Sequence, residues 1–495
     1  MLNIDFDKLK DTLLYNPDEP LMFNSGFFLF LFAGFIFFYV LLKKQNILRI
    51  LYVIVFSYYF YYKTSGGFFF LLAIITVWDY CIGLSISLFK EKNMRKFLLF
   101  LSLSGNLGIL CYFKFTDFVY EYICDLSGKD FNTLNIFLPI GISFYTFQSM
   151  SYTIDIYRRK IKPLENIWDY AFFVSFFPQL VAGPIIRAKD FLPQIHRPLL
   201  VTRNMFGRGV FLIATGLFKK AVISDYISAN FVDRIFDNPA LYSGIENLFG
   251  VYGYALQIYC DFSGYSDMAI GIALLLGFRF NDNFDSPYKS ATITEFWKRW
   301  HISLSSWLKD YLYISMGGNR KGTIRTYINI MITMLLGGLW HGASLRFVLW
   351  GGLHGITLVI HKMFLNLFPS LKSTGIRMKP FQRFLGILLT FHIVCFGWIF
   401  FRAENMESAV TMMHQIANNF HPELFCELIK GYPYVFLCIF AGFAAHYVPQ
   451  KWKRLGIEYT TSMPLLFKVL LLVMVIVIIS QVKSAEIQPF IYFQF

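Results

Sequence analysis

Apolar residues run along the chain in long stretches that short polar links separate. Thirteen stretches can be distinguished, at residues 22–42, 47–62, 67–89, 97–113, 134–151, 169–186, 208–225, 246–276, 328–348, 350–368, 384–401, 432–448 and 464–481. A membrane-spanning helix needs about 20 mostly apolar residues, and several stretches are short or interrupted by glycine, so we expect about 11–13 membrane segments. The strict alternation of a transmembrane β-barrel is absent. Because lipid offers no partner for open backbone groups, the pattern predicts an all-α, polytopic membrane helical bundle.

Composition agrees with a membrane protein. The chain is 56% hydrophobic and 15% charged, whereas soluble domains average about 25% charged residues. Residues 1–20 are acidic, and the apolar stretch after them is too long, and has the wrong flank, for a cleaved signal peptide. We therefore expect this stretch to remain as a span.

The net charge of +14 would suggest nucleic-acid binding in a soluble protein. In membrane proteins, lysine and arginine collect in cytoplasmic loops instead. The links at 43–49, 90–96 and 158–162 are basic, whereas those at 64–67 and 116–130 are not. This alternation predicts an extracytoplasmic N-terminus and a lipid bilayer, not nucleic acid, as the surrounding partner.

We expect one domain over residues 1–495, because no linker, low-complexity block or repeat divides the chain. Its least apolar internal part, 278–326, carries eight basic and four acidic residues. Within it, residues 294–313 place His301, Leu304, Leu308 and Leu312 on one helical face. This amphipathic pattern predicts a helix that lies in the membrane interface or re-enters it. A peripheral surface helix without a catalytic role is the alternative.

The stretch 335–343 places His341 in an apolar segment among glycine and alanine residues. Ionisable residues at membrane depth are costly and are therefore candidates for function. The alternative is a histidine that hydrogen-bonds a neighbouring helix. His354, which also has glycine neighbours, fits packing better than catalysis. The seven cysteines show no metal-binding spacing, and His301 and His341 have no third ligand at such a spacing, so no metal site is expected.

Six blocks of the sequence carry a resemblance to a known family. They are LPIGISFYTFQ (138–148), FPQLVAGPI (177–185), YCDFSGYSD (259–267), FWKRWHISLS (296–305), DYLYISMGGNR (310–320) and GLWHG (338–342). In this order they resemble the membrane-bound O-acyltransferase (MBOAT) family. The resemblance is closest to the bacterial branch that contains the alginate O-acetylation and teichoic-acid D-alanylation membrane subunits.

The resemblance implies a ring of helices around a thinned membrane core, with a tunnel that joins the two faces in the bacterial inner membrane. It also implies a cytoplasmic acyl donor, such as acetyl-CoA or another acyl thioester, and no bound cofactor. His341 matches the catalytic histidine of the family, and His301 matches a second, more variable polar position. An imidazole with a pKa near 6.5 suits a general base at neutral pH, so we assign His341 as the base and His301 as a positioning or oxyanion partner.

Further polar residues extend the candidate site. Four residues in apolar surroundings are interpreted as an internal polar network: Asp261, Ser263, Asp267 and Asp310. A Ser-His-Asp triad at Ser263 lacks the Gly-x-Ser-x-Gly elbow. Four basic residues could hold the phosphates of the donor: Lys298, Arg299, Arg320 and Lys321. The simple bias of positive charge toward the cytoplasm explains them equally well.

The chain ends in FIYFQF (490–495), which resembles the C-terminal tyrosine motif of D-alanylation systems, F-x-Y-x-x-F. The resemblance implies that Tyr492 accepts the acyl group and passes it outward as an aryl ester. A separate extracytoplasmic acyltransferase would then place it on a cell-envelope polysaccharide. An aromatic membrane-interface anchor is the alternative for Tyr492.

Three other functions stay open on the sequence alone. The acyl group could be D-alanyl or another acyl group instead of acetyl. A transporter of lipid-linked sugars would also have many spans, although it would often show paired repeats, which this chain lacks. An inactive scaffold of a glycan-export complex is the third, against which the intact histidine blocks argue.

Overall fold

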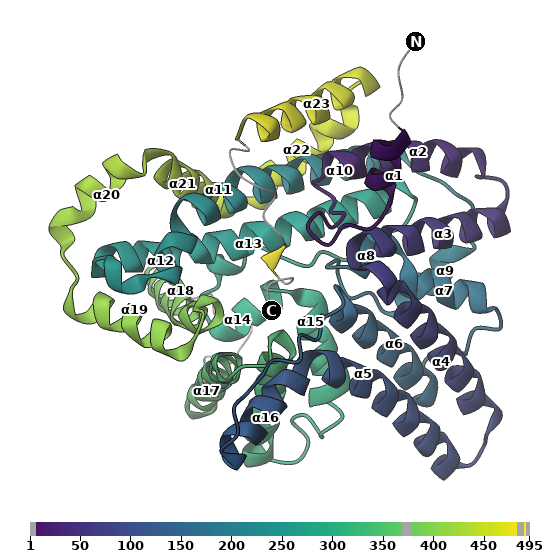
Figure 1. The fold of residues 1–495 in the computed structure, drawn as a ribbon, viewed down its shortest axis with the longest axis horizontal. Coiled ribbons are helices and arrows are strands. Elements are labelled where there is room, and N and C mark those ends of the chain that lie inside the picture. Colours follow the sequence, from purple (N-terminus) through teal and green to yellow (C-terminus); the bar gives the residue numbers. More distant parts are fainter. Residues whose placement is uncertain (1–5, 369–378, 483–489, 492–495) are drawn as a thin grey trace. The chain divides into compact units, whose positions relative to one another are not determined.

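The computed structural model describes residues 6–368, 379–482 and 490–491, and these are helical with short connections and no β-strand. Figure 1 shows the helices in chain order. The bounds of the helices in the first half are α1 Phe6–Leu13, α2 Gly26–Leu41, α3 Asn46–Ser65, α4 Phe69–Leu88, α5 Lys92–Ser127, α6 Ile142–Tyr157, α7 Ile167–Ser175, α8 Phe177–Leu180, α9 Ala188–Ile195, α10 Arg203–Leu217, α11 Asp225–Ile227 and α12 Asp233–Asp237. The prediction of an all-α protein is confirmed.

The second half begins with the long helix α13. The bounds are α13 Gly244–Leu275, α14 Ile293–Arg299, α15 Ile302–Trp307, α16 Thr323–His341, α17 Leu345–Leu367, α18 Pro380–Arg402, α19 Met406–Asn418, α20 Phe425–Gly431, α21 Pro433–Tyr447, α22 Gln450–Ser462 and α23 Leu465–Val482. Turns of π-helix follow α10 at Phe218–Ser224, α11 at Ser228–Val232 and α15 at Leu308–Tyr313.

Four helical stretches of the described chain are long and apolar enough to cross a membrane. They are Asn46–Leu88, Lys92–Ser127, Leu345–Leu367 and Pro380–Arg402. A fifth would be the pair Pro422–Gly431 and Pro433–Tyr447, which is bent by 99°. Most of the other apolar stretches fold as shorter or interrupted helices, whereas nearly all of 246–276 lies in the continuous helix α13 of 32 residues, which carries several acidic side chains. Fewer helices are therefore long and apolar enough to span a membrane than the apolar pattern predicts. Breaks within the interrupted stretches, such as Pro178 at the start of α8, explain part of the difference.

The chain divides into two compact units, one of residues 1–209 and 269–280 and the other of residues 210–268 and 281–495. Helices α10 and α13 each contribute residues to both units. The division therefore falls within two helices and not in a linker. The expectation of a single domain over residues 1–495 stays a prediction.

In the first unit, a buried polar cluster ties apolar helices together. Asp79 of α4 accepts hydrogen bonds from Ser102 Oγ at 2.6 Å and from Asn106 Nδ2 at 2.7 Å, both on α5. The Ser102 hydroxyl oxygen also lies at hydrogen-bond distance, 3.0 Å, from the hydroxyl of Thr153 on α6. Hydrogen bonds between helices in apolar surroundings fix the register of these three helices.

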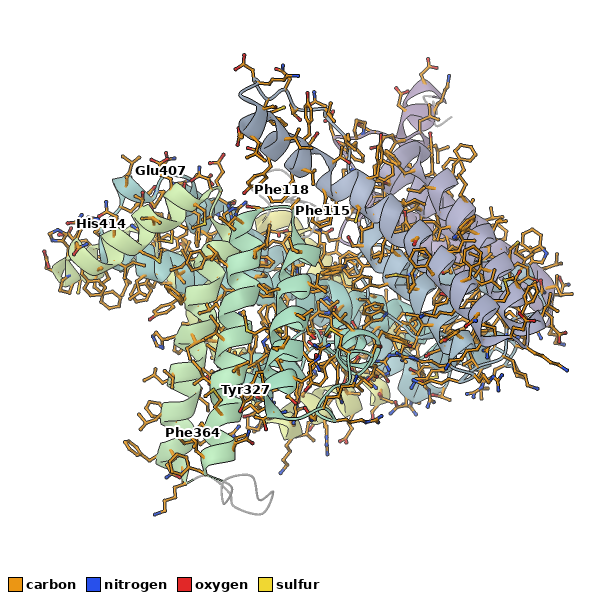
Figure 2. All side chains as sticks on the ribbon, turned by 90° about the horizontal axis from the view of Figure 1, so that it is seen from below. Phe115, Phe118, Tyr327, Phe364, Glu407 and His414 are labelled. Atoms are coloured by element: carbon orange, nitrogen blue, oxygen red, sulfur yellow. The ribbon has the colours of Figure 1, made fainter. Side chains whose placement is uncertain are left out.

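In the second unit, α16 and α17 form a closely packed antiparallel pair. Tyr327 near the start of α16 and Phe364 near the end of α17 lie at the same end of this pair (Figure 2), and the hydroxyl of Tyr327 accepts a hydrogen bond from Asn366 at 3.1 Å. Helix α18 and the short helix α14 both pack against α17. This group of helices carries both predicted histidine blocks.

Candidate active site

Glycine residues let α16 and α17 approach each other closely. A Cβ atom added at Gly338 would overlap the carbonyl oxygen of Phe347, and one at Gly351 would overlap a carbonyl oxygen of α16. At Gly342, just after α16, an added Cβ would overlap the ring of Phe347. Small residues at a helix contact allow this approach. The contact fixes the end of α16, where His341 is the last residue.

His341 lies among aromatic rings. Its side chain is buried, with the residue 4% exposed. The centroid of its ring is 4.9 Å from that of Trp340, 5.0 Å from that of Trp350 on α17 and 5.1 Å from that of Phe401 on α18. These contacts bury the imidazole and restrict its orientation, which suits a group that must meet a reacting atom in a defined geometry.

His301 lies at a break in the chain. It precedes α15 with a left-handed backbone, φ 43° and ψ 57°, a conformation that is uncommon outside glycine. The residue is fully buried. Its Nδ1 lies 3.2 Å from Asn283 Oδ1, and its ring packs edge-on against Phe262 at 4.5 Å. Burial lowers the pKa of His301 to about 3, so the ring is neutral at neutral pH.

The amphipathic helix that the sequence predicts over 294–313 is therefore not continuous. It is divided into α14, α15 and the π-helical turn Leu308–Tyr313, with the break at Trp300 and His301. The predicted buried face holds for His301, Leu304 and Leu308, of which none is more than 7% exposed. The hydrophobic period sets the buried face, whereas the hydrogen bonds of Asn283 stabilise the turned backbone that the period cannot reveal.

Both histidines contact one indole ring. The ring centroid of Trp340 lies 6.2 Å from that of His301 and 4.9 Å from that of His341. The two histidine blocks, 40 residues apart in the sequence, thus meet in the same part of the second unit. No group of three or more metal-binding side chains occurs in the described ranges.

A cavity of about 870 Å³ lies between α14, α15, α16 and α17. Its lining is exposed at Asn319 and Thr323 and buried at Thr333 and Met334, so it leads inward from the surface. Basic side chains line it, namely Lys298, Lys309, His361 and Lys362. Among the described residues that line it, none is acidic. The arrangement favours an anionic ligand with an apolar or neutral inner end.

One face of α16 runs from this cavity to His341. The cavity-lining residues of α16 are Thr323, Thr326, Ile330, Thr333 and Met334. This spacing of three and four residues defines one helical face, and Gly337 and His341 continue it. Met334 is seven residues before His341, which corresponds to about 10 Å along the helix.

The facing surface of α17 follows the same course. Its cavity-lining residues are Leu358, His361, Lys362, Leu365 and Asn366. His354 and Trp350 continue this face, and Trp350 touches His341. Trp297 of α14 lines the cavity and lies 5.7 Å from Trp350, measured between ring centroids. His341 is thus not part of the cavity lining, and the ring of Trp350 contacts both His341 and the lining residue Trp297.

Comparisons with known proteins identify the family of this chain. The family model for MBOAT, the membrane-bound O-acyltransferase family, matches residues 157–401, which include both histidines and the cavity. A Pseudomonas putida protein described as a probable alginate O-acetylase is 38% identical over 452 residues, which cover 85% of this chain and 89% of that protein. The chain belongs to the membrane-bound O-acyltransferase family.

Two further relatives show the breadth of the MBOAT likeness. A peptidoglycan O-acetyltransferase of Helicobacter pylori is 38% identical over 68% of each chain. A teichoic acid D-alanyltransferase of Bacillus subtilis is 27% identical over 54% of this chain and 70% of that protein. The protein is thus a membrane-bound acyltransferase, and it is more similar to the O-acetylating relatives than to the D-alanylating one.

The four basic residues predicted to bind the donor of this MBOAT enzyme do not lie together in the structure. Lys298 lines the cavity. Arg299 forms ion pairs with Asp285 at 3.3 Å and with Glu295 at 3.0 Å. Arg320 and Lys321 are exposed and do not line the cavity. The structure adds Lys309, which belongs to the basic segment 278–326. It also adds His361 and Lys362, which sequence reasoning missed because basic residues at the end of a span also fit the cytoplasmic charge bias.

The predicted polar network lies on α13 and in the π-helical turn after α15. Asp267 pairs with Lys219 at 2.6 Å, and Asp261 pairs with Lys220 at 2.7 Å. Ser263 is buried, and Asp310 is half-buried in the turn Leu308–Tyr313. Because Asp261 and Asp267 each pair with a lysine, these two carboxylates form ion pairs and not a Ser-His-Asp triad.

His354 is fully buried next to the histidine site. Its ring lies 4.8 Å from that of Trp350 and 5.1 Å from that of Trp297. Neither ring nitrogen of His354 has a hydrogen-bond partner among the described residues. Tyr492 lies outside the described residues, while the preceding Phe490 and Ile491 are buried.

Proposed function

We propose that this MBOAT enzyme takes an acyl group, acetyl by preference, from a thioester donor bound in the basic cavity. It transfers this group to the hydroxyl of an acceptor that lies next to His341. The acyl group is destined for a cell-envelope polymer. The observation that carries the proposal is the face of α16 that leads from the cavity-lining residues Thr323 to Met334 onward to His341.

The cavity suits an acyl thioester by charge and by size. Three lysines at its walls would bind the phosphates of coenzyme A or of a phosphopantetheine group. Its inner lining at Leu308, Thr333 and Met334 would accept the neutral arm and the acyl end. A volume of about 870 Å³ lies within the range of small-molecule sites, about 300–1,000 Å³.

At His341, the reaction is an acyl transfer with one proton in motion. The imidazole takes the proton of the attacking hydroxyl, whose oxygen bonds to the thioester carbonyl carbon. The carbon–sulfur bond then breaks, the proton passes to the departing thiolate, and an ester and a free thiol result. General base catalysis of this kind contributes about 10²–10⁴-fold.

His301 fits a positioning role better than an oxyanion role. The oxygen of Asn283 accepts hydrogen bonds from the backbone and hydroxyl of Ser303, so the nearby Nδ1 of His301 is assigned as protonated from this network. A neutral imidazole with Nδ1–H offers a lone pair at Nε2. It can accept a hydrogen bond but cannot donate one to an oxyanion from that atom.

The relatives support acetyl as the acyl group and an envelope polysaccharide as the acceptor. Two of them are described as acetylating alginate or peptidoglycan and are 38% identical to this chain, whereas the D-alanylating relative is 27% identical. We therefore place the enzyme in the bacterial inner membrane, with a cytoplasmic donor and an envelope polysaccharide as the final acceptor. Tyr492 serves as the relay, and a separate extracytoplasmic acyltransferase completes the transfer.

The test is acyl labelling of the purified full-length protein in detergent. The wild type, His341→Ala and Tyr492→Phe are each incubated with radiolabelled acetyl-CoA, and base-labile label on the protein is counted. We expect label on the wild type and none on either variant. A parallel reaction with a D-alanyl thioester identifies the acyl group.

Two outcomes would contradict the proposal in different ways. Full label on His341→Ala would remove His341 from the chemistry. If Tyr492→Phe carried as much label as the wild type, the acyl group would be on another residue, and the proposed relay through Tyr492 would be wrong. Absence of label and of thiol release in every sample would favour a transporter over an acetyl-CoA-dependent enzyme.

A further inference from the structure

The C-terminal end of the chain is attached to the second unit through its backbone. Phe490 is fully buried and Ile491 is 3% exposed. The ring of Phe490 lies 5.5 Å from that of Phe262 and 5.0 Å from that of Tyr265, both on α13. The backbone N–H of Ile491 donates a hydrogen bond to Asp261 Oδ2 at 2.8 Å.

Asp261 is held for this contact by a buried lysine. Its other oxygen, Oδ1, lies 2.7 Å from Lys220 Nζ, and the side chains of both residues are 3% exposed. Lys220 also pairs with Asp225 at 2.8 Å. Because Asp225 already neutralises the charge of Lys220, the lysine alone does not account for the buried negative charge of Asp261. A buried charge is costly unless it is paired and hydrogen-bonded, and the N–H of Ile491 completes its hydrogen bonding.

The attachment point lies close to the histidine site. The ring of Phe262 contacts Phe490 at 5.5 Å and His301 at 4.5 Å. A single ring therefore separates the anchored chain end from His301. Because Asp261 binds the backbone N–H of Ile491, the contact does not depend on the side chain of residue 491.

We propose that Asp261, oriented by Lys220, is a positioning residue that docks the C-terminal segment at Ile491 and so sets the register in which Tyr492 is presented to the histidine site. Its consequence for acyl transfer rests on the proposed relay through Tyr492. The docking itself is independent of that relay and can be tested without any acyl donor.

A neighbouring ion pair provides the matched control. Lys219 and Asp267 join the same π-helical turn, Phe218–Ser224, to the same helix α13, with a distance of 2.6 Å. Asp267→Asn therefore removes an ion pair between these elements without removing the bond to Ile491. Asp261→Asn removes the charge that holds the chain end and leaves Lys220 paired with Asp225.

The experiment follows trimming of the full-length protein in detergent by carboxypeptidase Y, with intact mass spectrometry as the readout. We expect trimming of the wild type and of Asp267→Asn to stop before Ile491. In Asp261→Asn, removal of Ile491 should be at least about tenfold faster, because a charge-assisted hydrogen bond is lost. Equal trimming of Asp261→Asn and the wild type, or equally fast trimming of both Asn variants, overturns the proposal.

A second pair of variants leaves the helices unchanged. Ile491→Pro lacks the N–H and should behave like Asp261→Asn, whereas Ile491→Val keeps the N–H and should behave like the wild type. Protection of Ile491→Pro at the wild-type level would overturn the proposal even if Asp261→Asn failed to fold.

Acyl labelling of the same proteins distinguishes docking from relay. If docking serves the relay, Asp261→Asn and Ile491→Pro lose label on Tyr492 but still release thiol slowly from acetyl-CoA by hydrolysis at His341. Faster trimming together with unchanged label on Tyr492 would overturn the positioning role. Absence of label on the wild type, with the trimming pattern as expected, would overturn the relay and leave the docking intact.

Discussion

The two ends of the α16–α17 pair differ in their chemistry although they belong to the same helices. One end opens into a cavity lined by Lys298, Lys309 and Lys362, with exposed residues at its edge. The other end is closed by aromatic rings around His341, where glycine brings the backbones into contact. Under the proposed function, the difference means that donor recognition and acyl transfer are separate tasks, joined by one face of α16. Variants at the two ends should therefore change different kinetic constants.

The largest effect is expected at the aromatic end. His341→Gln keeps a polar side chain of similar length but cannot act as a base at neutral pH. We expect kcat to fall by about 10²–10⁴-fold, with KM for the thioester nearly unchanged. The rate of thiol release by purified protein at saturating donor measures this. A loss of less than about tenfold would contradict the role of His341 as base.

The contact between the helices can be tested with two adjacent glycines. Gly338→Ala places a methyl group against the carbonyl oxygen of Phe347, whereas Gly337→Ala meets only the flexible side chain of Leu308 at 3.3 Å. Overpacking a tight contact costs about 1–3 kcal/mol, so Gly338→Ala should lower the melting temperature in detergent and reduce kcat. Gly337→Ala is the matched control for stability and should melt at the wild-type temperature; kcat is compared for Gly338→Ala only, because Gly337 lies on the face that leads to His341. Equal melting temperatures of the two variants would show that the helix contact at Gly338 is not tight.

The cavity end should affect donor binding alone. Reversing two charges in Lys309→Glu/Lys362→Glu should raise KM for acetyl-CoA about tenfold or more, while kcat changes little. Arg320→Glu/Lys321→Glu, exposed residues outside the cavity lining, is the control with the same charge change. If the control raised KM as much as the cavity variant, general attraction to the basic surface would explain binding instead of the cavity.

The smallest effect concerns pH. Burial lowers the pKa of His301 to about 3, while in the unfolded chain it is about 6.5. Between these values only the unfolded state binds the proton, so stability falls as pH decreases below about 6.5, by up to about 1.4 kcal/mol per pH unit. We expect His301→Asn to lose less melting temperature between pH 7 and pH 5 than the wild type. An identical pH dependence of the two proteins would show that His301 is not neutral in the folded state.

The features that repeat along the sequence could be predicted. Long apolar stretches predicted an all-helical membrane protein, and the block around His341 predicted a buried histidine next to glycine residues. The buried face of residues 294–313 could be read from its period. These features depend on local composition and on helical spacing, both of which are visible in the sequence.

The features that depend on distant contacts could not be predicted. The break at His301 depends on hydrogen bonds that Asn283, 18 residues earlier in the chain, accepts from the residues after the break. The cavity lysine Lys362 lies far along the chain from Lys298 and looks like an ordinary cytoplasmic end of a span. The bond between Asp261 and Ile491 joins residues 230 positions apart, and no local pattern at either residue indicates it.

The most direct test of the account is a side-by-side measurement of kcat and KM for acetyl-CoA in two variants, His341→Gln and Lys309→Glu/Lys362→Glu. If the cavity binds the donor and His341 performs the transfer, the first variant loses kcat with KM nearly unchanged, and the second raises KM with kcat nearly unchanged. A loss of the same constant in both variants, or no change in either, would contradict a donor site in the cavity that serves His341.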